Sequence, residues 1–340
     1  MKKLKILIFL SLIFCSLNAQ KQRLENEIYY IIKNKKATIG VAIIYDGKDT
    51  LTIHNDNKYP TMSVFKFHQS LALLDFMNKN LLSLDSKVFI KNSDIDAETY
   101  SPLAKECPNG NFYISIGDLI KYTVSQSDNN TSNFLFNYMN GTLMTDMYIR
   151  TLGIKNFSIT MTEKEMEGHF NNQYVNWTTP LEAAKLLEIF LKKDLFSNNF
   201  KDFLIQAMID TSTGNDKLKA SLPENIILGH KTGSSSRNAN GLKAADNDIG
   251  FIYLPNGKQY TIAIFVKDSK EDDQTNANII ANISKAVFKF YNDSYKRDKE
   301  RIENNDQLTK NQIKTQKSEL DKIYKDKKNA LIKEKKLIIK

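Results

Sequence analysis

The chain has 340 residues, of which 41% are hydrophobic and 10% aromatic, so it can bury a large core and is not disordered overall. Its formal net charge of +9 comes from the two ends. Residues 291–340 carry 15 Lys/Arg against 9 Asp/Glu, residues 1–19 add three lysines, and residues 20–290 carry 30 of each sign. A neutral central part argues against nucleic acid as a partner.

Residues 1–19 have the pattern of a secretory signal peptide. Three lysines are followed by an apolar run over residues 6–14 and by Leu17-Asn18-Ala19, a small-residue cleavage site. A short membrane anchor is the alternative, but the run is shorter than the roughly 20 residues of a spanning helix. We therefore expect a periplasmic protein. Without the leader, Cys107 is the one remaining cysteine, which excludes an internal disulfide.

The two ends of the central part predict a sheet with helices. Apolar spacing predicts a helix over 21–35 and a closing helix over 274–291. Between them, β-prone runs predict two hairpins, formed by 38–45 with 51–54 and by 249–254 with 260–267.

The middle of the chain has mostly helical patterns and interrupts these strands. The sequence thus predicts an α/β (α+β) domain over 20–291, whose mixed, mainly antiparallel sheet is built from distant parts of the chain. We assign 20–60 and 211–291 to the α/β part, 61–210 to an inserted helical part, and 292–340 to a charged basic C-terminal extension.

Ser63-Val64-Phe65-Lys66 is the one Ser-x-x-Lys in the chain. A serine hydroxyl is a weak nucleophile until a base takes its proton. If Ser63 opens a helix, Lys66 lies on the same face, three residues on. The apolar residues around this segment predict a buried helix, where the neutral amine that a base requires is favoured. Taken alone, the motif favours a serine cap with a surface lysine over a nucleophile with its base.

Two further motifs change that interpretation. Ser127-Asp128-Asn129 and Lys231-Thr232-Gly233 follow in that order, the second after a β-prone run. This ordered set resembles the signature of class A serine β-lactamases and, more distantly, of penicillin-binding proteins. The resemblance covers about residues 22–290 and implies the fold described above.

The resemblance implies a role for each motif. Ser63 would be acylated, and Ser127 would relay a proton to the lactam nitrogen. Asn129 would bind Lys66 and the acylamino carbonyl of the substrate. The remaining implied substrate-binding residues are Lys231 and Thr232 for the ring carboxylate, Gly233 for room along its strand, Ser234 for an oxyanion hole with the Ser63 N–H, Tyr100 as a cleft wall, and Lys217 in the place of a carboxylate-binding arginine.

Glu163 is the candidate residue that would distinguish a β-lactam hydrolase from a penicillin-binding protein that is acylated but does not turn over. Class A enzymes use a glutamate to activate the water that hydrolyses the acyl-enzyme. It opens Glu163-Lys164-Glu165-Met166-Glu167, where the common pattern is Glu-Pro-Glu-Leu-Asn. Glu167 replaces the asparagine that helps to hold the water. The loop resembles the divergent cephalosporinase and extended-spectrum branch of Bacteroides relatives. Either Lys66 or Glu163 acting through water would be the acylation base.

No metal or cofactor is expected, because His54, His68, His169 and His230 lack a metal-binding spacing. We predict a monomer that acts on small-molecule β-lactams and binds no nucleic acid, and we expect cephalosporins to be good substrates. Two alternatives stay open: a penicillin-binding acyltransferase or receptor without rapid turnover, and a non-catalytic envelope-binding protein. The extension would be a solvated helix, a disordered segment, or a basic surface for anionic envelope components.

Overall fold

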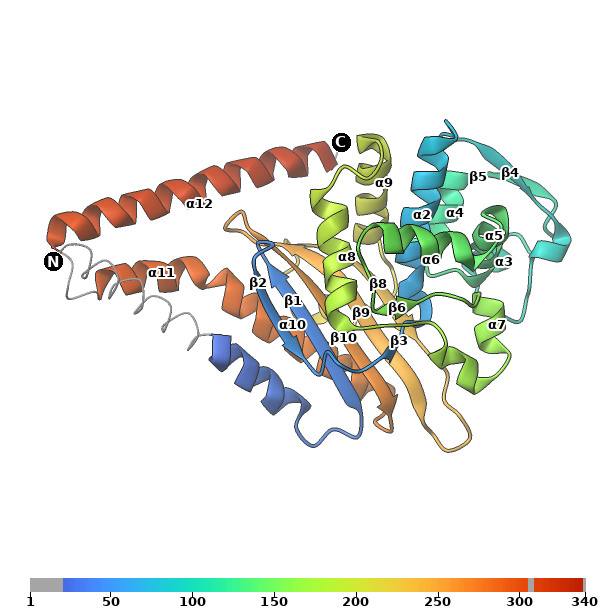
Figure 1. Ribbon diagram of the computed structural model, residues 1–340, viewed down its shortest axis with the longest axis horizontal. Coiled ribbons are helices and arrows are strands. Elements are labelled where there is room, and N and C mark those ends of the chain that lie inside the picture. Colours follow the sequence, from blue (N-terminus) through green and yellow to red (C-terminus); the bar gives the residue numbers. More distant parts are fainter. Residues whose placement is uncertain (1–20, 305–308, 339–340) are drawn as a thin grey trace.

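A five-stranded antiparallel sheet forms the centre of the computed structural model, which describes residues 21–304 and 309–338 (Figure 1). The strand order is β2-β1-β10-β9-β8. The strands are β1 (Thr38–Tyr45), β2 (Asp49–Ile53), β8 (Ile227–Ser234), β9 (Lys243–Tyr253) and β10 (Gln259–Ser269). The first two come from one end of the domain and the other three from the opposite end. The predicted α/β fold class with a mainly antiparallel sheet is confirmed.

Strand β9 begins six residues before the predicted 249–254. Its first half reads Lys-Ala-Ala-Asp-Asn-Asp, a sequence that normally disfavours a buried strand. All eleven residues of β9 are nevertheless buried, because partners from other elements satisfy the polar ones. Lys217 pairs with Asp246, and His230 bonds Asp248. Local sequence could not reveal these partners.

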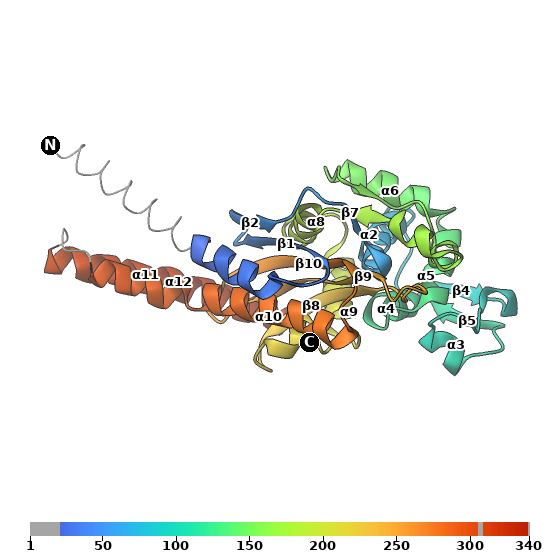
Figure 2. The ribbon, with the colours of Figure 1, turned by 90° about the horizontal axis from the view of Figure 1, so that it is seen from below.

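Helices cover both faces of the sheet, which explains why β1 is buried on both sides (Figure 2). The helical residues 21–32 and α10 (Asp273–Asn292) cover one face through Leu24, Ile28, Ile279 and Ile283. Helix α8 (Pro180–Lys192) packs on the other face. The first helix ends before the predicted residue 35, since Asn34 has a left-handed φ of 63°.

The helical part surrounds α2 (Phe65–Lys79), in which 11 of 15 residues are buried. Its other helices are α3 (Pro102–Glu106), α4 (Ile116–Ser125), α5 (Asn129–Tyr138), α6 (Thr142–Thr151), α7 (Glu163–Glu167) and α9 (Asn198–Ile209). Two small sheets were not predicted. One joins β3 (Tyr59–Pro60), β7 (Trp177–Thr178) and β6 (Phe157–Ser158), and the other pairs β4 (Lys87–Ile90) with β5 (Phe112–Ser115). The first of these sheets joins the segment before Ser63 to residues more than 90 positions later in the chain.

The described residues of the C-terminal extension form two helices. Helix α11 (Ser294–Glu303) continues away from the domain after α10, and α12 (Lys310–Ile338) returns towards α9 (Figure 1). Ion pairs join the two helices, Lys299 with Asp321 and Lys317 with Glu303. In the described ranges, no helix is both long and apolar enough to cross a membrane. The predicted leader 1–19 lies outside the described residues.

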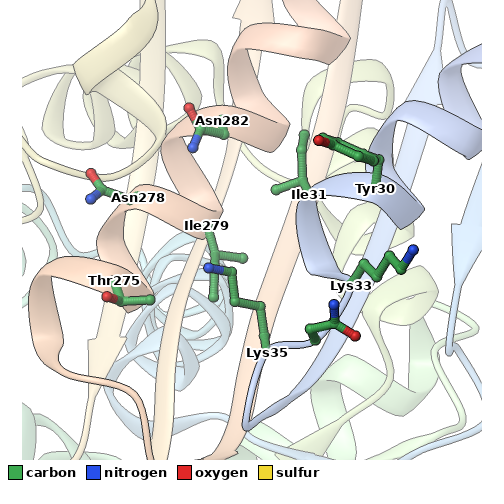
Figure 3. A pocket seen from close by; sticks show the side chains of 9 residues that line it. Tyr30, Ile31, Lys33, Lys35, Thr275, Asn278, Ile279 and Asn282 are labelled. Carbon is green, nitrogen blue, oxygen red and sulfur yellow. The ribbon is translucent and has the colours of Figure 1, made fainter.

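A groove of about 640 Å³ lies between the first helix and α10 (Figure 3). Tyr30 and Lys35 line one side, and Asn278 and Asn282 line the other. None of its lining residues is a predicted site residue, so it is separate from the site described next.

Candidate active site

Ser63 lies in a 3-10 turn, η1 (Met62–Val64), which leads directly into α2. The sequence predicted that Ser63 opens the helix itself, and the structure places it two residues earlier. The preceding Met62 has a φ of 43°, a strained conformation of the kind that concentrates at functional sites. Lys66 remains three residues on, in the first turn of α2.

Two hydrogen bonds to the backbone of residues 60 and 61 hold the strained turn in place. The N–H of Thr61 donates to the carbonyl of Asn176 at 2.9 Å, and the side chain of Asn247 donates to the carbonyl of Pro60 at 2.8 Å. Asn176 belongs to the loop that follows Glu163, and Asn247 belongs to β9. Sequence reasoning missed both residues. The one sequence signal that could have revealed Asn247 is an asparagine next to a run of strand-forming residues.

Lys66 is fully buried and surrounded by oxygen atoms. Its Nζ donates to Ser63 Oγ at 3.1 Å, to the Ser127 carbonyl at 2.7 Å and to Asn129 Oδ1 at 2.6 Å. An ammonium group has three protons, so these bonds use all of them. Glu163 Oε1 also lies 2.9 Å from Nζ and balances the buried charge.

Glu163 is the first residue of α7 and is buried beside the nucleophile. Ser63 Oγ donates to its Oε1 at 2.7 Å. The helix begins with a capping box in which Thr162 and Glu165 bond each other, as Thr and Glu three residues apart often do. The side chain of Asn176 fixes the preceding loop by accepting from the N–H groups of Thr160 and Met161. The carboxylate therefore contacts the hydroxyl directly.

Ser127 has a left-handed φ of 59°, and its Oγ accepts from Lys231 Nζ at 2.8 Å. This contact joins the helical part to β8. Two buried lysines thus hold Ser127, because Lys231 donates to its hydroxyl and Lys66 donates to its backbone carbonyl.

Asp128 caps α5 and positions the loop that carries Tyr100. Its buried carboxylate accepts from Ser101 Oγ at 2.7 Å and from the Leu103 N–H at 2.8 Å. The N–H of Asn129 donates to the Tyr100 carbonyl at 3.0 Å. The Tyr100 side chain itself is 51% exposed, so it is free to line an open cleft.

Burial lowers the pKa of Lys231 well below its usual value, and the nearby charge of Lys66 acts in the same direction. Charges on Glu163 and Asp248 oppose this shift. Besides Ser127, the amine donates to the Thr232 carbonyl at 2.9 Å. The Thr232 hydroxyl is 2.7 Å from the Thr213 hydroxyl.

Gly233 lies against the backbone of the nucleophile turn. A Cβ at this position would lie 2.5 Å from the Thr61 carbonyl and 3.0 Å from the Val64 N. The structure therefore gives a packing reason for this glycine, and its expected role of leaving room for substrate stays a prediction. This close approach brings Ser234, which is exposed, to the end of β8 nearest the turn.

Within residues 21–304 and 309–338, the Lys217 amine bonds Asp246 and makes no hydrogen bond to the residues above. It is buried, and its amine is paired with Asp246, which also accepts an ion pair from Lys243 at 3.0 Å. Its expected role towards a substrate carboxylate stays a prediction, and that role would require it to share its charge with Asp246.

The four histidines are dispersed. His230 bonds Asp248 at 3.0 Å, and burial lowers the pKa of His68 to about 4. His54 bonds the Ile39 carbonyl, and His169 is exposed. In residues 21–304 and 309–338, no group of three or more potential metal ligands occurs.

The assembled cluster combines the parts of an acyl-transfer site. A hydroxyl is bonded to a carboxylate, a buried ammonium supports both, and a second hydroxyl is held by a second lysine. Five separate elements supply these groups, namely η1, α2, the start of α5, α7 and β8.

Comparisons with known proteins agree with this chemistry. The sequence profile described as the Beta-lactamase enzyme family matches residues 22–291. A β-lactamase of Bacteroides uniformis is 48% identical over 270 residues, which cover 79% of this chain and 91% of that protein. The β-lactamase VEB-1 of Pseudomonas aeruginosa is 40% identical over 291 residues, 84% of this chain and 97% of that protein.

Solved structures give the same result. A class A β-lactamase from Bacteroides cellulosilyticus superposes with a TM-score of 0.79 at 46% identity, covering 81% of this chain and 99% of that one. The TLA-3 extended-spectrum β-lactamase superposes with a TM-score of 0.78 at 44% identity, covering 80% and 99%. Together with the serine and lysine cluster, these matches place the chain in the Beta-lactamase enzyme family, as a class A serine β-lactamase.

Proposed function

We propose that this enzyme opens the β-lactam ring of antibiotics, cephalosporins included, through an acyl-enzyme on Ser63 that Glu163 helps to hydrolyse. The observation that carries the proposal is the direct 2.7 Å hydrogen bond from the Ser63 hydroxyl to Glu163. It gives the nucleophile a proton acceptor within the reach that general-base catalysis needs.

In the acylation step, Ser63 Oγ attacks the lactam carbonyl carbon while its proton passes to Glu163. Between the two candidate bases, the contacts favour Glu163, because the Lys66 amine already donates to three oxygen atoms. Lys66 then stabilises the negative charge that develops on the serine oxygen. The N–H groups of Ser63 and Ser234 would stabilise the carbonyl oxygen, a contribution of about 10²–10³ in rate per donor.

Ring opening breaks the bond between the carbonyl carbon and the lactam nitrogen. The nitrogen takes a proton from the Ser127 hydroxyl, which the Lys231 ammonium holds in place at 2.8 Å. This step leaves an ester on Ser63. Before deacylation, the proton that Glu163 received passes through Lys66 to the Ser127 oxygen, which leaves Glu163 ionised again. Glu163 then takes a proton from the water that attacks the ester. It returns this proton to Ser63 Oγ as the ester bond breaks, and the product leaves with its ring opened.

Substrate recognition would use the groups around this centre. The charge of Lys231 and the hydroxyl of Thr232 suit the ring carboxylate, Asn129 suits the acylamino carbonyl, and Tyr100 provides an exposed wall. Lys217 would add positive charge to this region.

Cephalosporins are proposed as substrates because several relatives are extended-spectrum enzymes. Besides TLA-3, the extended-spectrum β-lactamase PER-1 of Pseudomonas aeruginosa is 35% identical to this chain over 274 residues. The altered loop around Glu163 is the feature of this chain that supports the same branch.

Mass spectrometry with a cephalosporin tests the function. We expect a Ser63 adduct that forms and then disappears within minutes, and no adduct on Ser63→Ala. A persistent adduct would favour a penicillin-binding receptor, and no adduct with no hydrolysis would favour a non-catalytic binding protein. Hydrolysis of benzylpenicillin without hydrolysis of any cephalosporin tried would contradict the proposal that cephalosporins are substrates.

The extension suggests a second role, attachment to anionic envelope components of the periplasm. Helix α12 carries ten lysines and four acidic residues and extends from the catalytic domain on α11 (Figure 1). Deleting 293–340 should leave hydrolysis intact and reduce binding to anionic phospholipid vesicles. Replacing the exposed Lys310, Lys314, Lys322 and Lys325 with glutamine should have the same effect. Equal vesicle binding by all three proteins would discard this role.

A further inference from the structure

The side-chain amide of Asn129 is engaged at both ends. Its Oδ1 accepts from Lys66 Nζ at 2.6 Å. Its Nδ2 donates to Thr99 Oγ1 at 2.9 Å and to Glu167 Oε1 at 2.8 Å. Because an amide nitrogen has two protons, both are used within the protein.

Glu167 and Thr99 approach Asn129 from different loops. Thr99 precedes Tyr100, and Glu167 is the last residue of α7, the helix that Glu163 begins. Thr99 Oγ1 donates to the same Glu167 oxygen at 2.8 Å. One carboxylate oxygen thus accepts two hydrogen bonds and joins the Tyr100 loop to the loop of the proposed base.

The two partners of this bond differ in exposure. Asn129 is 7% exposed, whereas Glu167 lies at the surface. A carboxylate that leaves Asn129 regains hydrogen bonds from water, but the buried amide does not. A carbonyl oxygen brought by a ligand can therefore replace Glu167 on Asn129 with little net loss of hydrogen bonding.

We propose that Glu167 is a latch that substrate displaces: its carboxylate occupies the Asn129 N–H that the acylamino carbonyl of a β-lactam needs. This inference rests on the proposed function, in which Asn129 binds that carbonyl. Glu167 acts through Asn129, so it is a specificity-determining positioning residue. It disfavours acylamino substrates relative to a bare lactam nucleus, which has no carbonyl to compete for the amide.

The test compares benzylpenicillin, which has an acylamino carbonyl, with 6-aminopenicillanic acid, which has none. The value of kcat/KM reports the steps through acylation, and the ratio of the two values cancels any loss of folded enzyme. Glu167→Ala should raise this ratio about threefold to tenfold, the usual range for one hydrogen bond. Glu167→Gln keeps an acceptor oxygen and should restore the ratio towards that of the unchanged enzyme.

Glu98→Ala is the matched control. Glu98 is an exposed acid next to Thr99, and its backbone N–H bonds Asp96, so the change removes the same charge from the same rim. It should leave the ratio unchanged. The latch is overturned if Glu167→Ala leaves the ratio as it was, or if Glu98→Ala raises it equally. Failure of the proposed function is seen separately in the unchanged enzyme, either as a persistent benzylpenicillin adduct on Ser63 or as neither adduct nor hydrolysis.

Discussion

The hydroxyl of Ser63 donates to the carboxylate of Glu163 at 2.7 Å, although the two residues are 100 positions apart in the chain. Lys66 lies 2.9 Å from the same carboxylate oxygen. The nucleophile, the buried cation and the acid are therefore already in contact before substrate arrives. Such preorganisation means that the groups need no large rearrangement during the reaction.

Glu163→Gln tests the role of this carboxylate in deacylation. Glutamine fills the same space but cannot take a proton from Ser63 or from water. Acylation and deacylation should therefore both slow, and the acyl-enzyme that forms should persist. We expect deacylation to slow by about 10²–10⁴, the usual contribution of general-base catalysis. Mass spectrometry after mixing with a cephalosporin measures the adduct. The control Glu224→Gln changes an exposed acid outside the site and should turn over normally. Normal turnover by Glu163→Gln would reject the assignment.

The lowered pKa of Lys231 predicts how kcat/KM changes as the pH rises. Burial holds the pKa of its amine well below the usual 10.5, so rising pH removes its positive charge earlier than from a free lysine. The charge for the substrate carboxylate is then lost, and kcat/KM should fall at a pH below 10.5. Lys231→Arg keeps its charge at these pH values and should move the fall to higher pH. An unmoved profile, as expected for the exposed control Lys270→Arg, would contradict this.

The lowered pKa of His68 predicts that the protein loses stability in mild acid. Burial lowers the pKa of His68 from 6.5 to about 4, so between these values the unfolded chain binds a proton that the folded protein does not. Stability from the neutral histidine is present above pH 6.5 and is lost as the pH falls towards 4. At pH 5 the loss is roughly 2 kcal/mol in the free energy of unfolding.

Urea unfolding at pH 7 and pH 5 measures this loss. His68→Met removes the titrating group and should reduce the difference between the two pH values. His169→Gln changes an exposed histidine and should leave the difference as it is. If His68→Met and the unchanged protein lose the same stability, another group is responsible.

Gly233→Ala tests the close approach of β8 to the nucleophile turn. The added methyl would lie 2.5 Å from the Thr61 carbonyl, so the turn must shift. We expect a loss of about 1–3 kcal/mol in the free energy of unfolding, typical of overpacking, together with slower acylation. Thermal unfolding and kcat/KM report the two effects. Gly168→Ala would meet its nearest atom at 3.4 Å and should be nearly neutral. Equal stability of both variants would show that the turn accommodates the methyl group.

Local patterns determined much of the fold. The helical spacing of Ile279, Ile280 and Ile283 predicted α10, and the β-branched run over 38–45 predicted β1 with its observed bounds. The ordered motifs around Ser63, Ser127 and Lys231 identified the chemistry, because residue types and their order are properties of the chain itself.

Contacts between distant segments were decided by the tertiary structure alone. Asp246 and Asp248 make a strand unpromising until Lys217 and His230 satisfy them from other elements. In the same way, the replacement of asparagine by Glu167 suggested added charge beside the base, whereas the folded chain places this carboxylate on Asn129. Propensity and periodicity act over a few residues, so the sequence determined which elements form and which groups can react. The packing of those elements decided which side chains meet.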